Sequence, residues 1–229
     1  MRDDPTSIML FAAGFGSRMR PMTDVIPKPL VRVADQALLD HALELVTPDI
    51  ADTCVINTHY FADQIQDHVR GKPIQLSYEP TLLDTGGGLK NALPLLPSAS
   101  VFTLNTDAVW TGENPLAQLK DHWDPNRMDA LLLLAAPEHA IGHKGNGDFL
   151  CDPNMQLSWG PGAVYLGAQI IKTSAVESIK DDVFSMRKVW DQLLNAGRLY
   201  GVIHAGQWCD VGYPEAIETA EALLADDRS

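Results

Sequence analysis

Residues 9–30 read MLFAAGFGSRMRPMTDVIPKPL, an apolar run followed by a loop rich in glycine and proline. The apolar run spans 8–13 and predicts a buried strand that ends abruptly at Gly14. Gly14 and Gly16 carry no Cβ atom, so the backbone between them can approach a ligand closely. Successive backbone N–H groups in such a loop can bind an anion. The stretch therefore predicts a strand that leads directly into an anion-binding loop.

Two cations downstream of the glycines could face the same anion. Arg18 offers a planar fork of donors to phosphate oxygens, and Lys28 offers a mobile point charge. Pro27 and Pro29 bracket Lys28 and restrict its backbone. Neither common nucleotide-binding motif fits, because Met19 stands where the dinucleotide fingerprint needs a third glycine and no Gly-Lys-Ser/Thr follows. A glycine turn with a proline-rich loop and no ligand is the alternative interpretation.

The full pattern GxGxRMRPxTxxxPKPL closely resembles the signature of the sugar-1-phosphate nucleotidyltransferases. These enzymes join a sugar phosphate to a nucleoside triphosphate and release pyrophosphate. Phe11 and Ser17 are mild departures, since the family usually has Leu and Thr at these positions. The resemblance implies that Arg18 and Lys28 are catalytic. It also implies that the loop backbone binds the nucleotide, through Ala12, Ala13, Gly14 and Gly16.

The composition limits the partners and the location of the protein. The chain has 229 residues and carries 17 Lys and Arg against 30 Asp and Glu, a formal charge of -13. This balance argues against nucleic acid as a partner, because binding a phosphate backbone requires a basic surface. Three widely spaced cysteines suit a reducing compartment, and the N-terminus reads as neither a signal peptide nor a membrane span. We therefore expect a cytoplasmic protein, a monomer or weak dimer, with no membrane partner.

Apolar runs alternate with stretches of helical periodicity along the whole chain, which predicts a parallel sheet covered by helices. The fold that we expect is a single-domain α/β three-layer sandwich over 1–229, with a mostly parallel mixed sheet and a Rossmann-like core. A glycine-rich insertion at about 137–162 reads as a loop or hairpin. The predicted strands are 8–13, 53–58, 74–78, 101–105, 129–135, 163–171 and 199–204. The predicted helices are 37–46, 60–69, 85–93, 114–122, 185–196 and 214–224.

Two aspartates follow apolar stretches and are candidate metal ligands. Asp107 comes directly after the strand at 101–105, where ligands bind in open α/β sheets. Asp210 lies in Trp-Cys-Asp-Val-Gly at 208–212. By itself Asp107 reads equally well as a turn or cap residue. The resemblance implies that both aspartates hold Mg2+, a hard cation that prefers carboxylate oxygens, and that Asn105 contacts the nucleotide.

The sequence Asp-Thr-Gly-Gly-Gly at 84–88 opens a predicted helix. Thr85 can cap this helix, and the glycines would let the backbone lie against a planar base. The resemblance implies nucleotide contacts from Thr85, Gly86 and Gly87, while a merely flexible start of the helix is the alternative. Asn57, at the end of the second strand, is a further candidate for contacting the base.

A subfamily resemblance concerns the sugar. Gly-Asn-Gly-Asp-Phe at 145–149, Val-Trp-Thr at 109–111 and Trp-Cys-Asp-Val-Gly are similar to stretches of bacterial N-acetylmuramate-1-phosphate uridylyltransferases. This implies UTP and N-acetylmuramic acid 1-phosphate as substrates, in cell-wall recycling, with Asp148 and Gly162 in the sugar site. Trp-Gly-Pro-Gly at 159–162 departs from the Phe-Ser-Gly that this subfamily tends to have.

Other readings stay open at this stage. Mannose-1-phosphate guanylyltransferases and glucose-1-phosphate thymidylyltransferases usually carry Glu-Lys-Pro after the central strand, whereas 137–139 read Pro-Glu-His. Mannose-1-phosphate guanylyltransferase and glucose-1-phosphate thymidylyl- or uridylyltransferase are the alternatives within the family. A catalytically silent, nucleotide-binding regulatory subunit is the alternative of another class.

Overall fold

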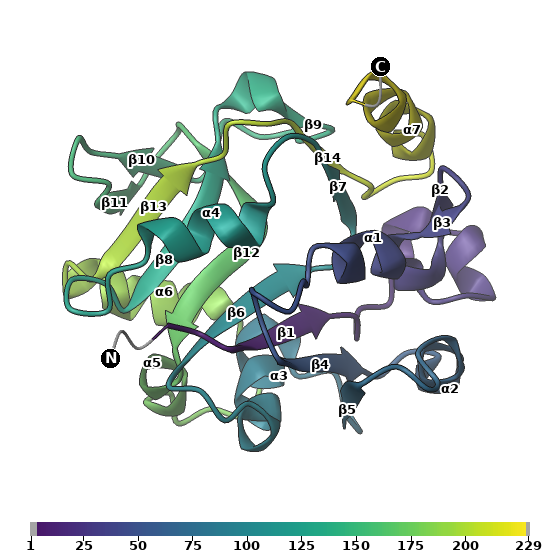
Figure 1. Ribbon diagram of the computed structural model, residues 1–229, viewed down its shortest axis with the longest axis horizontal. Helices are drawn as coiled ribbons and strands as arrows, with labels where there is room; N and C mark the ends of the chain where they lie inside the picture. Colours follow the sequence, from purple (N-terminus) through teal and green to yellow (C-terminus); the bar gives the residue numbers. More distant parts are fainter. Residues whose placement is uncertain (1–3, 228–229) are drawn as a thin grey trace.

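The computed structural model describes residues 4–227, and the first three and last two residues lie outside the described part. A seven-stranded sheet runs through the molecule in the order β13-β8-β12-β6-β1-β4-β5 (Figure 1). Only β12 runs antiparallel to its neighbours in this sheet, so the mostly parallel mixed sheet is confirmed. The strands are β1 (Ser7–Phe11), β4 (Thr53–Thr58), β5 (Ile74–Tyr78), β6 (Ser100–Asn105), β8 (Ala130–Ala135), β12 (Val164–Lys172) and β13 (Leu199–Ile203).

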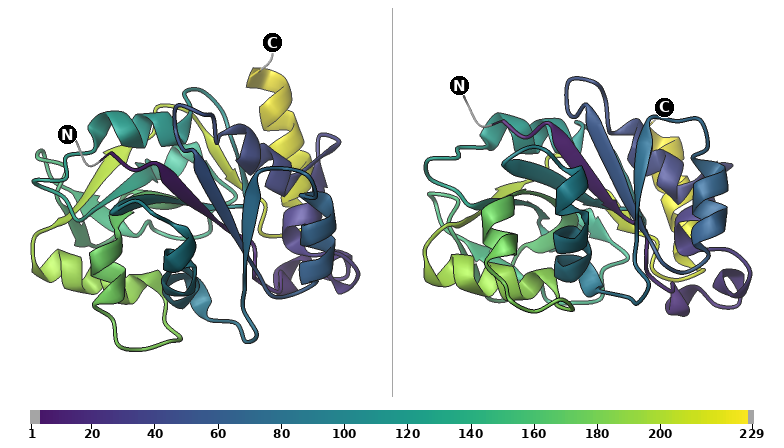
Figure 2. Two further views of the ribbon diagram at one scale, coloured as in Figure 1. Left: turned by 60° about the horizontal axis from the view of Figure 1, so that its bottom comes forward. Right: turned by 90° about the horizontal axis from the view of Figure 1, so that it is seen from below.

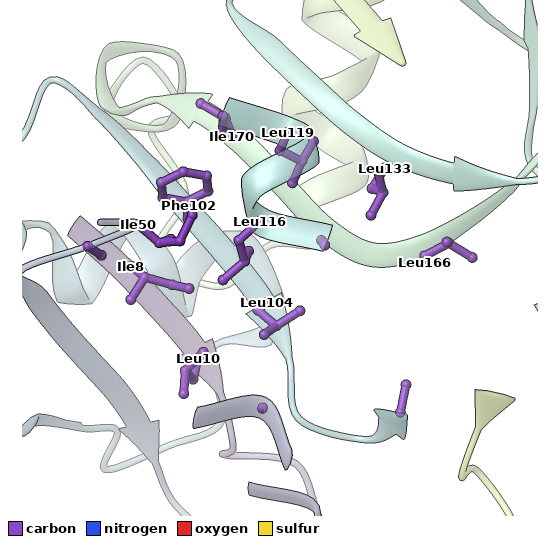
Figure 3. Close-up of a cluster of buried hydrophobic side chains, with 14 of the residues drawn as sticks. Ile8, Leu10, Ile50, Phe102, Leu104, Leu116, Leu119, Leu133, Leu166 and Ile170 are labelled. Atoms are coloured by element: carbon purple, nitrogen blue, oxygen red, sulfur yellow. The ribbon is translucent and has the colours of Figure 1, made fainter. Parts of the chain in front are cut away.

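Alternate residues of the strands belong to two apolar cores. Ile8 and Leu10 of β1 join one cluster, whereas Met9 joins the other, as the two-residue period of a strand requires. The first cluster includes side chains of α1 (Leu38–Glu44), α2 (Ala62–His68) and α4 (Pro115–His122); Figure 3 shows part of it. The second includes side chains of α3 (Asp84–Ala92), α5 (Thr173–Glu177) and α6 (Met186–Asn195). Figure 2 shows helices on both sides of the sheet, so the predicted α/β three-layer sandwich is confirmed.

Shorter elements surround the end of the sheet toward which β1 and β6 point. A three-stranded sheet contains β7 (Ala108–Trp110), β14 (Trp208–Asp210) and β9 (Ala140–Ile141). The C-terminal helix α7 (Ala216–Asp227) packs against β14, and the two-residue strands β2 (Arg32–Val33) and β3 (Gln36–Ala37) form a hairpin nearby. Five 3-10 turns complete the description, η1 (Ser17–Met19), η2 (Met22–Asp24), η3 (Lys28–Leu30), η4 (Leu93–Leu95) and η5 (Pro137–His139).

The insertion, which the sequence predicted to be a loop or hairpin, contains a hairpin. Its first part contributes β9, which pairs with β14, and its second part forms the hairpin of β10 (Phe149–Cys151) and β11 (Leu157–Trp159). Phe149 is fully buried and stacks on Trp159, with ring centroids 4.5 Å apart. Within residues 4–227, every helix is too short or too polar to span a lipid bilayer. That 1–229 form one domain stays a prediction.

An ionic cluster connects the neighbouring strands β13, β8 and β12 at the end of the sheet opposite to the three-stranded sheet. Asp129 precedes β8, and its Oδ1 accepts hydrogen bonds from Lys172 Nζ at 2.8 Å and Arg198 Nη2 at 3.0 Å. Burial by itself would raise the pKa of Asp129. The hydrogen bonds from Arg198 and Lys172 and the charges of both residues outweigh burial, so the pKa lies below its ordinary value. The carboxylate therefore stabilises the fold where it is ionised.

We expect the Asp129→Asn variant to be less stable than the wild type at pH 7, by about 1–2 kcal/mol, because charged hydrogen bonds are lost. The folded pKa is depressed, so this stabilisation is present above the unfolded pKa of about 4 and disappears as pH falls through the lower folded value. Urea unfolding at pH 7 and at decreasing acidic pH measures the difference. A stability difference that does not shrink in acid would contradict this role of Asp129.

Candidate active site

The register of three parallel strands brings polar side chains to one edge of the sheet. Phe11, the last residue of β1, pairs with Asn57 of β4 on one side and Asn105 of β6 on the other. A cavity of about 330 Å³ opens at this edge. It is lined by residues 11–14, 16–19, 28–29, 57, 82, 84–85, 105–107 and 212. All the predicted nucleotide-binding residues of the first loop, together with Asn57, Thr85 and Asn105, belong to this lining.

Glycine is required at position 16 for two reasons. Its φ of +60° lies in the left-handed region, which residues with a side chain rarely adopt. An added Cβ would also come within 2.8 Å of Lys28 Cβ. The Gly16 carbonyl accepts hydrogen bonds from Met19 N and Thr23 Oγ1, both at 2.8 Å, which fix the turn. Gly14 differs, because an added Cβ there would meet open space.

Lys28 lies at the start of η3 and is buried despite its charge. Its Nζ contacts Asp107 Oδ2 at 2.9 Å. A buried lysine requires such a partner, because an unpaired charge away from water is costly. The structure thus brings together the two predicted residues Lys28 and Asp107, 79 positions apart in the sequence.

Strand pairing brings Asp107 and Asp210 to the same place. Asp107 precedes β7, and Asp210 ends β14, which pairs antiparallel with β7 so that Asp210 lies opposite Ala108. The Val211 N–H also donates to the Asp107 carbonyl at 2.8 Å. The two predicted metal ligands are therefore close neighbours in the fold.

Burial and neighbouring charges shift the pKa of Asp210. Burial, and next the negative charge of Asp107, raise the pKa of Asp210 above its ordinary value, while the nearby charges of Lys28 and Arg18 oppose this rise. A cation between the two carboxyl groups would remove their repulsion. Residues 4–227 contain no group of three His, Cys, Asp or Glu side chains arranged for a metal ion. A cation held here would therefore take its other oxygen ligands from water or from phosphate.

Arg18 lies against the ring of Tyr213, which sequence analysis did not single out. Arg18 Nη1 donates to Tyr213 Oη at 3.4 Å, and its Cζ is 4.9 Å from the ring centroid. Lys144 Nζ, from the insertion, is 4.3 Å from the same centroid. The hydrogen bond from Arg18 and the charges of Arg18 and Lys144 lower the pKa of Tyr213 below its ordinary value. Tyr213 follows directly on the motif that contains Asp210, which was the one signal for it in the sequence.

The predicted cap at Thr85 was wrong. The helix α3 begins at Asp84, its N-cap position is Leu83, and no side chain caps it. The Thr85 hydroxyl instead accepts a hydrogen bond from Met186 N at 2.9 Å, at the start of α6. The hydroxyl that was predicted to cap α3 therefore connects α3 to the start of α6.

Gly86 and Gly87 face the protein interior. An added Cβ on Gly86 would overlap the Phe184 ring, and one on Gly87 would overlap the Asp182 carbonyl. Close packing against residues 182–184 is thus a sufficient reason for these two glycines. Their predicted contact with the nucleotide stays a prediction.

Asp148 and Gly162 lie in the insertion, outside the set of residues lining the cavity. Asp148 Oδ2 accepts a hydrogen bond from Tyr165 N at 2.9 Å, at the beginning of β12. Gly162 N donates to the Asn146 carbonyl at 2.9 Å. Both residues support the shape of the insertion, and their contact with a sugar stays a prediction.

Comparison with known proteins identifies the class. Residues 8–217 match the family described as the MobA-like NTP transferase domain. Because this match covers most of the chain, the protein belongs to that family, as the resemblance of its first loop to nucleotidyltransferases indicated.

Two curated relatives and one solved structure are sugar-phosphate nucleotidyltransferases by name. The chain is 38% identical to N-acetylmuramate alpha-1-phosphate uridylyltransferase of Caulobacter vibrioides, over 99% of this chain and 100% of that protein. It is 31% identical to the enzyme of the same name from Neisseria meningitidis, over 94% and 96% of the two chains. A solved structure of a putative glucose-1-phosphate thymidylyltransferase from Bacillus anthracis, in complex with a sucrose, superposes with a TM-score of 0.80 at 15% identity. That superposition covers 96% of this chain and 95% of the other, and it shows the shared fold.

We expect Lys28→Ala to lower turnover about a hundredfold or more, by analogy with the loss of one preorganised donor to a developing negative charge. Turnover is measured as pyrophosphate release, and folding is checked by thermal unfolding. Lys72→Ala is the matched control, because Lys72 Nζ is also 2.9 Å from an aspartate, Asp40, outside the cavity. Equal turnover of the two variants would remove Lys28 from the catalytic machinery.

Proposed function

We propose that this protein is a sugar-1-phosphate nucleotidyltransferase that forms UDP-N-acetylmuramic acid from UTP and N-acetylmuramic acid 1-phosphate. One observation carries the proposal: Lys28, Arg18 and Asp107 line one cavity together with the glycine loop, and the carboxyl group of Asp210 interacts with all three charges. Similarity over nearly the full length to two uridylyltransferases supports the choice of substrates.

The reaction that we propose is an in-line displacement at the α-phosphorus of the triphosphate. A phosphate oxygen of the sugar 1-phosphate forms the new bond, and the bond between the α-phosphorus and the oxygen bridging to the β-phosphorus breaks. The attacking oxygen is an anion near neutral pH, so the reaction requires no general base. It requires positioning of two anions and neutralisation of their charge.

The cations of the site supply this neutralisation. Lys28 contacts the α-phosphate and the incoming phosphate, and its buried position keeps the ammonium group close to the reacting atoms. Arg18 holds the departing pyrophosphate with a planar fork of donors. The backbone of the first loop, together with Asn57 and Asn105, binds the nucleotide at the edge of the sheet.

Asp107 and Asp210 fit a divalent cation. Burial and the negative charge of Asp107 raise the pKa of Asp210 even though Lys28 and Arg18 oppose the rise. We propose that they hold Mg2+, which when bound supplies positive charge to phosphate oxygens. Asp148 keeps Oδ1 for a sugar hydroxyl, because Oδ2 accepts from Tyr165 N. Asp148 and Gly162 then belong to the sugar side of the site.

The substrate proposal is tested by a panel of nucleoside triphosphates and sugar 1-phosphates, with release of pyrophosphate as the measurement. We expect UTP with N-acetylmuramic acid 1-phosphate to give the highest kcat/KM. Sites that hydrogen-bond a specific polar group reject analogues lacking it strongly. Faster turnover of GTP with mannose 1-phosphate, or of a triphosphate with glucose 1-phosphate, would refute the substrates and leave the reaction class intact.

We expect Asp210→Asn to require a higher Mg2+ concentration for half-maximal turnover, because removing one of two carboxylates leaves an incomplete site for a hard cation. Addition of Mg2+ should also stabilise the wild type against thermal unfolding more than the variant. Asp52→Asn is the control, since Asp52 is exposed and precedes β4, away from the pairing of β7 with β14 that brings Asp210 beside Asp107. Identical Mg2+ dependence of Asp210→Asn and wild type would make Asp210 a structural residue.

A further inference from the structure

A fully buried carboxyl group lies behind the wall of the cavity. Glu79 follows β5 and is 0% exposed, and no Lys or Arg within residues 4–227 forms a salt bridge with it. Its Oε1 accepts a hydrogen bond from Asn57 Nδ2 at 2.7 Å, and its Oε2 accepts one from Leu83 N at 3.0 Å. Burying such a group is costly unless its oxygens are hydrogen-bonded. Both carboxyl oxygens of Glu79 therefore accept a hydrogen bond, one from β4 and one from the residue before α3.

These contacts leave Asn57 only one amide orientation. Asn57 Oδ1 accepts from Ala12 N at 2.7 Å, while its Nδ2 donates to Glu79. A flipped amide would place its NH2 group against the Ala12 N–H and its oxygen against an oxygen of Glu79, and both contacts would be repulsive. Glu79 and Ala12 therefore determine the orientation from opposite sides.

The fixed orientation determines what Asn57 offers to a ligand. The NH2 group has two N–H bonds and gives one to Glu79, so one N–H remains. Asn57 lines the cavity beside Ala12, at the carboxyl end of β4. Asn57 is 3% exposed, and the remaining N–H is the donor that it can offer to a ligand in this cavity.

We propose that Glu79 is a positioning residue for base selection, which holds Asn57 as a donor to the 4-carbonyl oxygen of uracil. Cytosine carries an amino group at that position, so the same N–H would face another donor. The inference rests on the proposed function, because it requires UTP to be the nucleotide of this cavity. A pocket that hydrogen-bonds a specific group discriminates far more strongly than one that recognises shape alone.

Gly88 of α3 provides the space for this arrangement. An added Cβ there would be 2.6 Å from Glu79 Oε1 and 2.9 Å from Asn57 Nδ2. Both distances are shorter than real Cβ contacts, so any side chain at position 88 displaces the pair. Gly88→Ala therefore disturbs the orientation of Asn57 without removing any hydrogen-bonding group.

The experiment uses the full chain with UTP and CTP competing in one mixture, and N-acetylmuramic acid 1-phosphate as the second substrate. The ratio of UDP-sugar to CDP-sugar is measured for wild type, Glu79→Gln and Gly88→Ala. Glutamine has only one acceptor oxygen, so its NH2 group must face either Asn57 Nδ2 or Leu83 N. We expect the ratio to fall about tenfold or more in both variants. This ratio does not depend on the fraction of active enzyme, so a loss of stability alone leaves it unchanged.

The matched control is another buried amide side chain whose oxygen and nitrogen both form hydrogen bonds. Gln169 is 1% exposed, its Oε1 accepts from Trp190 Nε1 at 2.9 Å, and its Nε2 donates to Thr103 Oγ1 at 3.1 Å. Gln169 lies outside the lining of the cavity. Gln169→Met should lower the unfolding temperature without changing the UDP-to-CDP ratio.

The outcomes separate the two proposals. A wild type that uses UTP and CTP equally, or a folded Glu79→Gln variant with the wild-type ratio, would overturn the role of Glu79. If Glu79→Gln does not fold, an unchanged ratio in Gly88→Ala would do the same. If the wild type turns over GTP but neither pyrimidine nucleotide, the proposed function is contradicted. The proposed role of Glu79 in base selection is then refuted as well.

Discussion

The parallel register of β1 with its two neighbours is the constraint on which the candidate site depends. Because Phe11 pairs with both Asn57 and Asn105, the glycine loop leaves β1 between two polar strand ends. A slip of one residue would turn every side chain of β1 to the opposite face and exchange its two apolar cores. The buried residues Met9 and Leu10 of β1 therefore fix the position of the glycine loop that follows the strand.

The charges at this edge balance one another only in part. Lys28 is paired with Asp107, whereas Asp210 has a raised pKa because burial and Asp107 outweigh the nearby cations. Arg18 rests on an aromatic ring and has no carboxylate partner within 4.0 Å among residues 4–227. An acidic chain with a formal charge of -13 thus keeps Arg18 and Lys28 together in the lining of the cavity beside the glycine loop.

Sequence was sufficient where a short stretch rich in β-forming residues is bounded by turn residues. The predicted strands at 53–58 and 74–78 coincide with β4 and β5, and the residues around the glycine loop lie together as expected. Strands of two or three residues, such as β9 and β14, are too short to show a period. The Thr85 prediction failed because its hydroxyl bonds a backbone group 101 residues away. The contacts of Glu79 with Asn57 and of Tyr213 with Arg18 were not predicted for the same reason, since these partners become neighbours only in the folded chain.

The packing at Gly16 has a genetic consequence. Its hydrogen atom occupies the place where any Cβ would press on Lys28, and its backbone is left-handed. Every missense change in the codon for residue 16 would therefore displace the ammonium-bearing side chain. In a screen for loss of function, such alleles would be indistinguishable from changes in the lysine itself, although glycine contributes no functional group.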